Sequence, residues 1–339
     1  MSREHERVGR EGTRRARWGR RLRRSGTTVV ALVLVGAGYE RVGAWRDLRR
    51  VPAQGARVDL GDGRAIHLDC RGAGSPTVLL EAGFRGWSPA WTAVQPEVAA
   101  FTRVCSYDRA GLGLSDTGPR PRTVEAVNAD LARALERAQI APPYVLVGHS
   151  AGGMYQRRFL VAHPDQVTGL VLVDTDVPTD DADRRAVATG DDDRTTGRIL
   201  TALSYTGVFR LLFRTLEMRI GSAESERYPE EAKVRFSATM TRLGAAMPDE
   251  WTLYQSAYAS MTTASLGDLP LVVIAALGYR PTPADRADWI ARQTSLARLS
   301  TRGRLIVRED QTHYLPLVEP ETVTNAIREV VTASRAAPE

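Results

Sequence analysis

The chain has 339 residues, 43% of them hydrophobic, which is enough for one core of about 250–300 residues. Its formal net charge of +6 is concentrated at the N-terminus, where residues 1–24 hold ten arginines against three glutamates. The remainder is close to neutral, which excludes the basic stripe that a nucleic-acid-binding surface needs. The sequence therefore predicts one neutral globular domain behind a strongly basic segment.

An uncharged apolar run at residues 27–39 follows the arginines. This order is typical of an export or anchoring signal whose arginines stay on the cytoplasmic side. The run is shorter than the ~20 residues that cross hydrocarbon comfortably. Extending it to Trp45 adds Glu40 and Arg41, which would have to reach the far interface.

We therefore expect a cytoplasmic tail at residues 1–26, a single-pass cell-membrane anchor at 27–45 and a polar linker at 46–55, with the globular domain outside the cytoplasm. Two alternatives stay open. Residues 35–37 could be a small-residue cleavage site, which would give a secreted domain. The apolar run could also be an ordinary buried N-terminal helix.

Short apolar strands alternate with helices through the rest of the chain. Glycine and aspartate at residues 61–63 lie between two such strands and predict a β-hairpin. The alternation indicates an α/β fold with a mostly parallel sheet covered by helices on both faces. The expected strands are residues 56–60, 64–70, 77–81, 103–107, 144–147, 169–173, 269–276 and 304–308, and the expected helices are 123–139, 154–162, 284–299 and 319–332.

Residues 178–267 interrupt this alternation, since they contain no convincing strand. They begin with an acidic patch and continue with helical spacing at residues 199–216, 229–243 and 248–261. We expect a helical cap here, above the carboxyl edge of a core formed by residues 56–177 and 268–335. Its most apolar face is expected to pack on the core, although lining an acyl pocket or touching the membrane are alternatives. That face comprises Leu200, Leu203, Val208, Phe209, Leu212 and Phe213.

Residues 148–152 read Gly-His-Ser-Ala-Gly between an apolar strand and a helix. This arrangement is typical of a nucleophile elbow, in which a sharp turn exposes Ser150 at the carboxyl edge of the sheet. A side chain at Gly148 or Gly152 would strike the neighbouring strand or helix. The pentapeptide alone is common by chance, but the flanking strand and helix make it specific.

A serine hydroxyl is a poor nucleophile at neutral pH and needs a general base. Of the five histidines, His313 follows the last predicted strand, on a loop that should lie at the same sheet edge as Ser150. The order serine, acid, histidine along the chain also fits. We expect His313 to be the base.

The acid that orients this base is harder to place. The loop after the seventh strand, residues 275–280, contains no carboxylate. Asp174 ends the sixth strand beside the elbow strand, and we expect it to be the acid. Asp176 and Asp285 are the alternatives, although Asp285 also fits the start of a helix.

An oxyanion hole needs two backbone N–H groups aimed at one point. Ala151 would supply one because it follows the nucleophile, and Phe84 the other from the loop after the third strand. Gly83 and Gly86 beside Phe84 are also compatible with a plain turn.

The only cysteines are Cys70 and Cys105, each in a predicted strand, so a zinc site is not supported. A disulfide, which requires an oxidising compartment, and two buried free thiols are both open.

Together these motifs resemble the α/β-hydrolase superfamily over residues 56–335. The most specific parts are the elbow, residues 107–116 (Tyr-Asp-Arg-Ala-Gly-Leu-Gly-Leu-Ser-Asp), residues 81–83 (Glu-Ala-Gly) and His313 in its loop. The resemblance implies an eight-stranded sheet with an antiparallel second strand, a Ser–His–Asp triad, and the two cysteines on neighbouring strands. The chain departs from the pattern at Ala82, where many members carry histidine, and in lacking an acid after strand seven. The second departure moves the acid to Asp174, a position that some cap-bearing relatives use.

The expected activity is therefore that of a serine hydrolase, EC 3.1-like, which cleaves an ester, thioester or amide of a small molecule through an acyl-enzyme without metal or organic cofactor. Dehalogenases and epoxide hydrolases are disfavoured because their elbow nucleophile is aspartate. A C–C bond hydrolase, a cofactor-free haloperoxidase and a non-catalytic binding protein of the same fold are the alternatives. The sequence does not identify the substrate.

Overall fold

The computed structural model describes residues 2–50, 54–178, 187, 194–215 and 230–336. A single eight-stranded sheet has the order β1-β2-β4-β3-β5-β6-β7-β8. β2 pairs antiparallel with both β1 and β4, and every pair from β4 to β8 is parallel, which confirms the expected fold. The strands are β1 (Ala56–Asp59), β2 (Ala65–Arg71), β3 (Thr77–Glu81), β4 (Val104–Tyr107), β5 (Tyr144–His149), β6 (Val167–Val173), β7 (Leu271–Ala276) and β8 (Gly303–Arg308).

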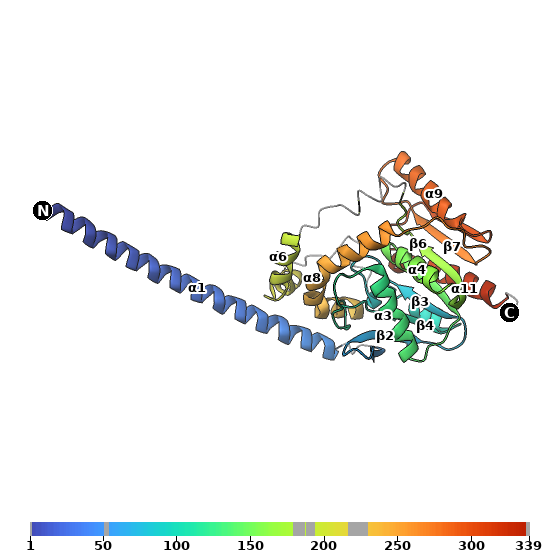
Figure 1. Ribbon diagram of the computed structural model, residues 1–339, viewed down its shortest axis with the longest axis horizontal. Coiled ribbons are helices and arrows are strands. Elements are labelled where there is room, and N and C mark those ends of the chain that lie inside the picture. The colour runs from blue at the N-terminus through green and yellow to red at the C-terminus, as the bar shows by residue number, and fades with distance from the viewer. Residues whose placement is uncertain (1, 51–53, 179–186, 188–193, 216–229, 337–339) are drawn as a thin grey trace.

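Helices cover both faces of the sheet (Figure 1). The central strand β5 divides its side chains between two cores, since Leu146 faces one cluster while Val145 and Val147 face the other. The first cluster is closed by α3 (Val124–Arg137) and α4 (Ala151–Ala162), the second by α2 (Gln95–Ala99) and α11 (Pro320–Arg335). The remaining core helices are η1 (Ser88–Trp91), η2 (Pro164–Gln166), α9 (Pro283–Ala297) and α10 (Leu315–Val318).

The cap differs from the expected helices in two places. The predicted helix at 199–216 is two helices, α6 (Arg194–Ser204) and α7 (Val208–Thr215), because Gly207 between them has φ +71°. The two predicted helices at 229–243 and 248–261 are one, α8 (Glu230–Ala259), which continues through Pro248. All six aspartates of the acidic patch lie outside the described residues.

The N-terminal helix α1 (Ser2–Arg50) extends away from the domain and passes the cap (Figure 1). Within the described residues, its segment Gly26–Arg50 is the one helix long and apolar enough to cross a membrane. The helix does not end at residue 45, so residues 46–50 are not the expected linker. No glycine or proline interrupts the chain between Ala44 and Arg50, and Asp47 is held in the helix by a contact with the cap.

That contact is a buried ion cluster. Arg210 of α7 is 2% exposed and pairs with Glu40 at 2.9 Å and with Asp47. Gly36 and Gly43 lie on the same side of α1, where an added Cβ would strike Thr206 and Arg210 respectively. Glu40 is therefore paired with the cap, whereas the sequence suggested that it would extend to a membrane interface.

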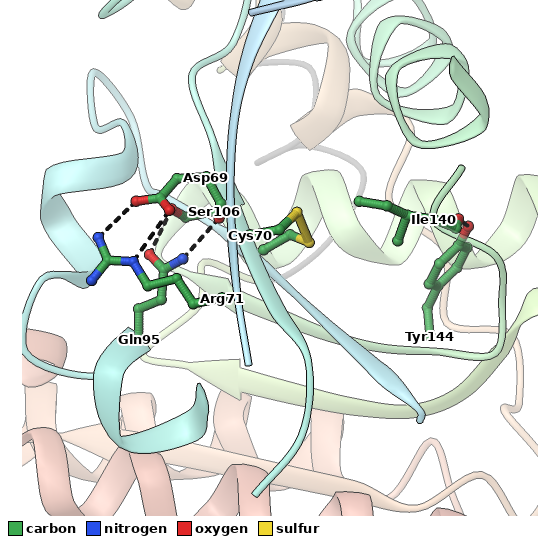
Figure 2. The surroundings of a disulfide bond; sticks show 8 residues. Asp69, Cys70, Arg71, Gln95, Ser106, Ile140 and Tyr144 are labelled. Carbon is green, nitrogen blue, oxygen red and sulfur yellow. Dashed lines mark hydrogen bonds and ion pairs between the residues drawn. A yellow bond between two sulfur atoms is a disulfide. The ribbon is translucent and has the colours of Figure 1, made fainter. Parts of the chain in front are cut away.

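Cys70 on β2 and Cys105 on β4 are register partners and form a disulfide. Their placement on neighbouring strands agrees with the family resemblance. Beside the bond, buried Gln95 donates to the carbonyl of Asp69 and accepts from the hydroxyl of Ser106, both at 2.8 Å (Figure 2). The two strands are thus joined covalently and through the side chain of α2.

Candidate active site

Ser150 lies at the turn between β5 and α4 in the geometry expected of a nucleophile elbow. Its backbone is strained, with φ +54° and ψ −128°. A Cβ on Gly148 would lie 2.4 Å from the Cα of Gly153, and one on Gly152 would lie 2.5 Å from the carbonyl oxygen of Glu81. The two glycines are therefore required by close backbone approach, as the sequence indicated.

Asp174 and His313 are in direct contact. The loop between β8 and α10 carries His313, and its Nδ1 lies 2.6 Å from Oδ2 of Asp174, which follows β6. Asp174 is fully buried with φ +47°, a conformation that non-glycine residues rarely adopt. Although burial raises its pKa, the hydrogen bond from His313 leads the contacts that hold the pKa below its ordinary value. Asp174 is thus a carboxylate that can fix the orientation of the imidazole.

Three further groups donate to Asp174, and none of them was predicted from the sequence. The backbone N–H of Ala276 and the indole N–H of Trp289 donate to Oδ1 at 2.9 and 2.8 Å, and the hydroxyl of Tyr279 donates to Oδ2 at 2.7 Å. Ala276 ends β7, Tyr279 lies in the loop that follows it, and Trp289 lies in α9. Members of the family that the chain resembles often place the acid itself just after β7. Residues 275–280, which contain no carboxylate, instead donate hydrogen bonds to the carboxylate that follows the neighbouring strand β6.

The other two candidate acids make different contacts. Asp176 accepts a hydrogen bond from the hydroxyl of Tyr254 in α8 at 3.1 Å. Asp285 is exposed and completes a capping box with Thr282 at the start of α9. Of the three, Asp174 is therefore the one that the structure brings to His313.

His149 is hydrogen-bonded to the loop that carries His313. Its Nε2–H donates to the backbone carbonyl of His313 at 2.8 Å, and the two rings are 4.8 Å apart. Burial lowers the pKa of His149 to about 3, and the neighbouring His313 adds to this effect. His149 is consequently neutral at physiological pH and acts on the site as a hydrogen-bond donor.

The predicted oxyanion groups lie on either side of the elbow. Ala151 is the first residue of α4, so its N–H has no carbonyl partner within that helix. Phe84 lies in the loop after β3, where a Cβ on Gly83 would approach the Cβ of Ser150 to 3.0 Å. This loop therefore passes directly over Ser150.

A buried ion network, which was not predicted from the sequence, holds this loop in place. Arg109, from the 107–116 motif, donates to the carbonyls of Ala82 at 2.9 Å and Gly83 at 3.0 Å. Its charge is balanced by Glu81 at 2.6 Å and by Glu250 of the cap helix α8 at 2.5 Å. Glu250 also accepts from the backbone N–H of residue 85 at 2.8 Å. The cap thus takes part in shaping the loop.

A cavity of about 490 Å³ connects these groups. Ser150 and His313 both line it, together with Phe84 and residues of the cap. The apolar cap face predicted from residues 200–213 is not part of this lining, and Phe213 lies where side chains are not described. The lining residues are Gly83, Phe84, Gly86, Ala90, His149, Ser150, Asp176, Val187, Trp251, Tyr254, His313, Tyr314, Pro316 and Leu317.

Besides this arrangement of elbow, histidine loop and capped cavity, the sequence itself matches a known family. A family profile described as the alpha/beta hydrolase fold matches residues 76–254, more than half of the chain. The chain belongs to the α/β-hydrolase family. Within the described part of this hydrolase, no group of three or more His, Cys, Asp or Glu side chains is placed to hold a metal ion.

Similar proteins cover only part of this α/β-hydrolase. The uncharacterized protein C23C11.06c of Schizosaccharomyces pombe is 35% identical over 151 residues, 36% of this chain and 28% of that protein. The uncharacterized vacuolar membrane protein YNL115C of Saccharomyces cerevisiae is 35% identical over 104 residues, 30% of this chain and 16% of that protein. The chain spans less than half of the length of the curated relatives it matches.

Solved structures of the same fold cover the domain more fully. An esterase from Thermogutta terrifontis has a TM-score of 0.58 at 22% identity, over 83% of this chain and 99% of that one. The enol-lactonase of Burkholderia xenovorans LB400 has a TM-score of 0.55 at 19% identity, over 80% and 98%. At these identities the similarity establishes the fold alone.

Proposed function

We propose that this α/β-hydrolase is a serine hydrolase that cleaves a carboxylic ester or a related acyl compound of a small molecule. The observation that carries the proposal is the 2.6 Å contact between Asp174 and His313 on the cavity that Ser150 lines. A buried carboxylate on Nδ1 selects the imidazole tautomer whose Nε2 is free to accept a proton. An esterase among the structural neighbours is compatible with this activity.

In the proposed reaction, His313 removes the proton of the Ser150 hydroxyl while its oxygen attacks the acyl carbon. Asp174 stabilises the imidazolium that forms, and the N–H groups of Phe84 and Ala151 stabilise the oxyanion. The imidazolium then protonates the leaving group, and an acyl-enzyme remains on Ser150. Water, deprotonated by the same imidazole, releases the acid.

A fluorophosphonate probe and a 4-nitrophenyl ester test the proposal together. The wild type should be labelled and should hydrolyse the ester, whereas Ser150→Ala should do neither. Asp174→Asn should still take the probe slowly but lose about 10⁴-fold in kcat, since the wrong imidazole tautomer would be favoured. Equal labelling of wild type and Ser150→Ala would refute the role of Ser150, and near-normal turnover by Asp174→Asn would remove Asp174 from the mechanism. If the wild type instead catalyses C–C bond cleavage or halogenation, and Ser150→Ala and Asp174→Asn lose that reaction, a C–C hydrolase or a haloperoxidase would be favoured.

We further propose that α1 anchors the protein in the cell membrane as a single span, with the core (56–177 and 268–335) and the cap (178–267) outside the cytoplasm. Six aliphatic side chains between Val29 and Val35 are 45–72% exposed. This exposure of apolar surface is costly in water and favourable in lipid. The arginines before them would remain on the cytoplasmic side. The Saccharomyces relative, described as a vacuolar membrane protein, is compatible with this placement.

Carbonate extraction of membranes tests the anchor. The full chain should stay in the membrane pellet at pH 11, and a chain that begins at residue 51 should be soluble. Release of the full chain into the supernatant would contradict a spanning helix. A secreted protein that lacks residues 1–37 would instead support signal cleavage.

A further inference from the structure

We infer that the cavity beside Ser150 binds the positively charged group of a cationic ester, held between Asp176 and the aromatic rings of Trp251 and Tyr254. This inference rests on the proposed serine hydrolase activity and adds the class of substrate. The group would be an ammonium or a comparable organic cation, on either the acyl or the alcohol side of the ester. The site belongs jointly to the core and the cap.

Asp176 supplies the negative charge of this subsite. It lies two residues after Asp174, lines the cavity, and accepts one hydrogen bond at Oδ2 from Tyr254. Within the described part of the chain, Oδ1 has no hydrogen-bond partner. Burial raises the pKa of Asp176, as expected for a carboxylate that lacks a full counter-charge. A cation in the cavity would supply that counter-charge.

The cap side chains supply the aromatic surface. The rings of Trp251 and Tyr254 are stacked, 5.6 Å apart and inclined by 11°, and both line the cavity. Phe84 meets the two rings edge-on, at 6.2 and 5.8 Å. The face of an aromatic ring carries partial negative charge and attracts a cation within about 6 Å. Tyr254 is itself stacked on Tyr258, with the ring centroids 5.8 Å apart, so a cation beside the carboxylate of Asp176 would meet mainly the ring of Trp251. A neutral alkyl group in the same place would gain only the contact with the ring.

Among the described residues of the lining, the basic side chain that acts on Asp176 is His313, whose Nδ1 is already held by Asp174. The lining residues include neither lysine nor arginine, and His149 is neutral because its pKa is lowered to about 3. The nearest guanidinium that acts on Asp176 is that of Arg280. It lies over the rings of Tyr279 and Trp289, at 4.4 and 3.8 Å, outside the cavity lining. An anionic group placed against Asp176 would be repelled by its carboxylate.

Three esters test the inference, of which the first two have the same shape and differ in charge and the third carries a carboxylate at the same chain length. They are 4-nitrophenyl 4-(trimethylammonio)butanoate, its neutral isostere 4-nitrophenyl 5,5-dimethylhexanoate, and the anionic 4-nitrophenyl hydrogen glutarate. The wild type should prefer the cationic ester over the neutral one by about 10–100-fold in kcat/KM, the value of one or two charge-assisted contacts. The anionic ester should be the poorest substrate.

Asp176→Asn keeps the shape and the acceptor for Tyr254 but removes the charge, so the preference ratio should fall to near one. Asp288→Asn is the matched control, since it removes an exposed carboxylate of α9 that pairs with Arg292, and its ratio should equal that of the wild type. If Asp176→Asn does not fold, tetramethylammonium chloride gives a second measurement on the wild type. It should inhibit hydrolysis of the neutral ester competitively, beyond the effect of sodium chloride at equal ionic strength.

A wild-type ratio near one, or a ratio that Asp176→Asn leaves unchanged, would overturn the cationic subsite and leave the proposed hydrolase standing. Absence of competitive inhibition by tetramethylammonium would overturn it as well. Failure to hydrolyse any of the three esters, together with failure to react with a fluorophosphonate, would overturn the proposed function and this inference with it.

Discussion

The charge state of His149 depends on the fold. It stands beside the nucleophile, is buried, and donates to the carbonyl of His313. Because burial lowers its pKa to about 3, the folded protein takes up the proton less readily than the unfolded chain, whose histidines titrate near 6.5. His149 therefore favours the folded state fully above pH ~6.5, and this contribution is lost as the pH falls toward about 3.

Replacement of His149 should flatten the acid side of the stability profile. Between pH 7.5 and 4.5 the wild type should lose roughly 2.5 kcal/mol more unfolding free energy than His149→Gln, which can still donate to the His313 carbonyl. Guanidinium unfolding at the two pH values, followed by tryptophan fluorescence, measures both losses. Since the carboxylates titrate in both proteins, equal losses would show that His149 is not the group responsible.

Among single residues, the site candidates that a motif or their order along the chain identifies could be predicted from the sequence. Ser150 is marked by its glycines, and His313 and Asp174 by their positions after strands. Tyr279 and Trp289 were missed because a tyrosine or tryptophan that donates to a buried carboxylate has no local pattern of its own. Their role follows from a contact across 105 and 115 residues of chain, which only the folded structure reveals.

At the scale of elements, the loop over the nucleophile depends on an ion pair with the cap. Arg109 holds the loop carbonyls and is itself neutralised by Glu81 and Glu250. Burial raises the pKa of Glu81 to about 7, so near neutral pH the positive charge of Arg109 is balanced chiefly by Glu250. Removal of one partner from such a buried pair is far more damaging than removal of a surface pair.

Glu250→Ala should lower the free energy of unfolding by about 3–5 kcal/mol and should also lower kcat, because the loop that carries Phe84 loses its support. The adjacent residue offers a matched control. Asp249 pairs with Arg120, whose side chain is 68% exposed, so Asp249→Ala should cost less than about 1 kcal/mol and leave kcat unchanged. Thermal unfolding and ester hydrolysis of the two variants give the comparison, and similar effects at both positions would contradict a role for the buried pair.

The elements themselves were largely predictable, since the eight strands and the core helices follow hydrophobic period and turn residues. The cap was predicted less well. Pro248 was expected to separate two helices, yet α8 continues through it, and tertiary contacts such as those of Glu250 outweigh the local penalty. Gly207 had the opposite effect and divided a segment whose apolar spacing looked continuous.

At the scale of the whole molecule, the disulfide bears on the compartment. Cys70 and Cys105 are 35 residues apart and join neighbouring strands. Disulfides of this kind persist outside the reducing cytoplasm, which agrees with a domain exported behind its anchor. The sequence left the thiols as an open alternative because the register of β2 against β4 could not be derived from the sequence alone.

Replacement of both cysteines by alanine should lower the unfolding free energy by about 3 kcal/mol, since the unfolded chain would regain the freedom of a loop of this length. Denaturant unfolding of the wild type with and without reductant provides the parallel measurement. Mass-tagging with a maleimide after denaturation should modify neither cysteine until the protein is reduced. Two freely reactive thiols in protein taken directly from membranes would contradict both the bond and the exported location.

The cluster of Arg210 with Glu40 and Asp47 has a mechanical consequence. These three charges join α1 to α7 of the cap, and Arg210 also donates to the carbonyl of Ser237 in α8, the helix that carries the cavity residues Trp251 and Tyr254. A force or a tilt applied along α1 would thus reach α8 of the cap, and through Glu250 the loop above Ser150. We therefore expect a change in the tilt of α1 to alter the shape of the cavity beside Ser150.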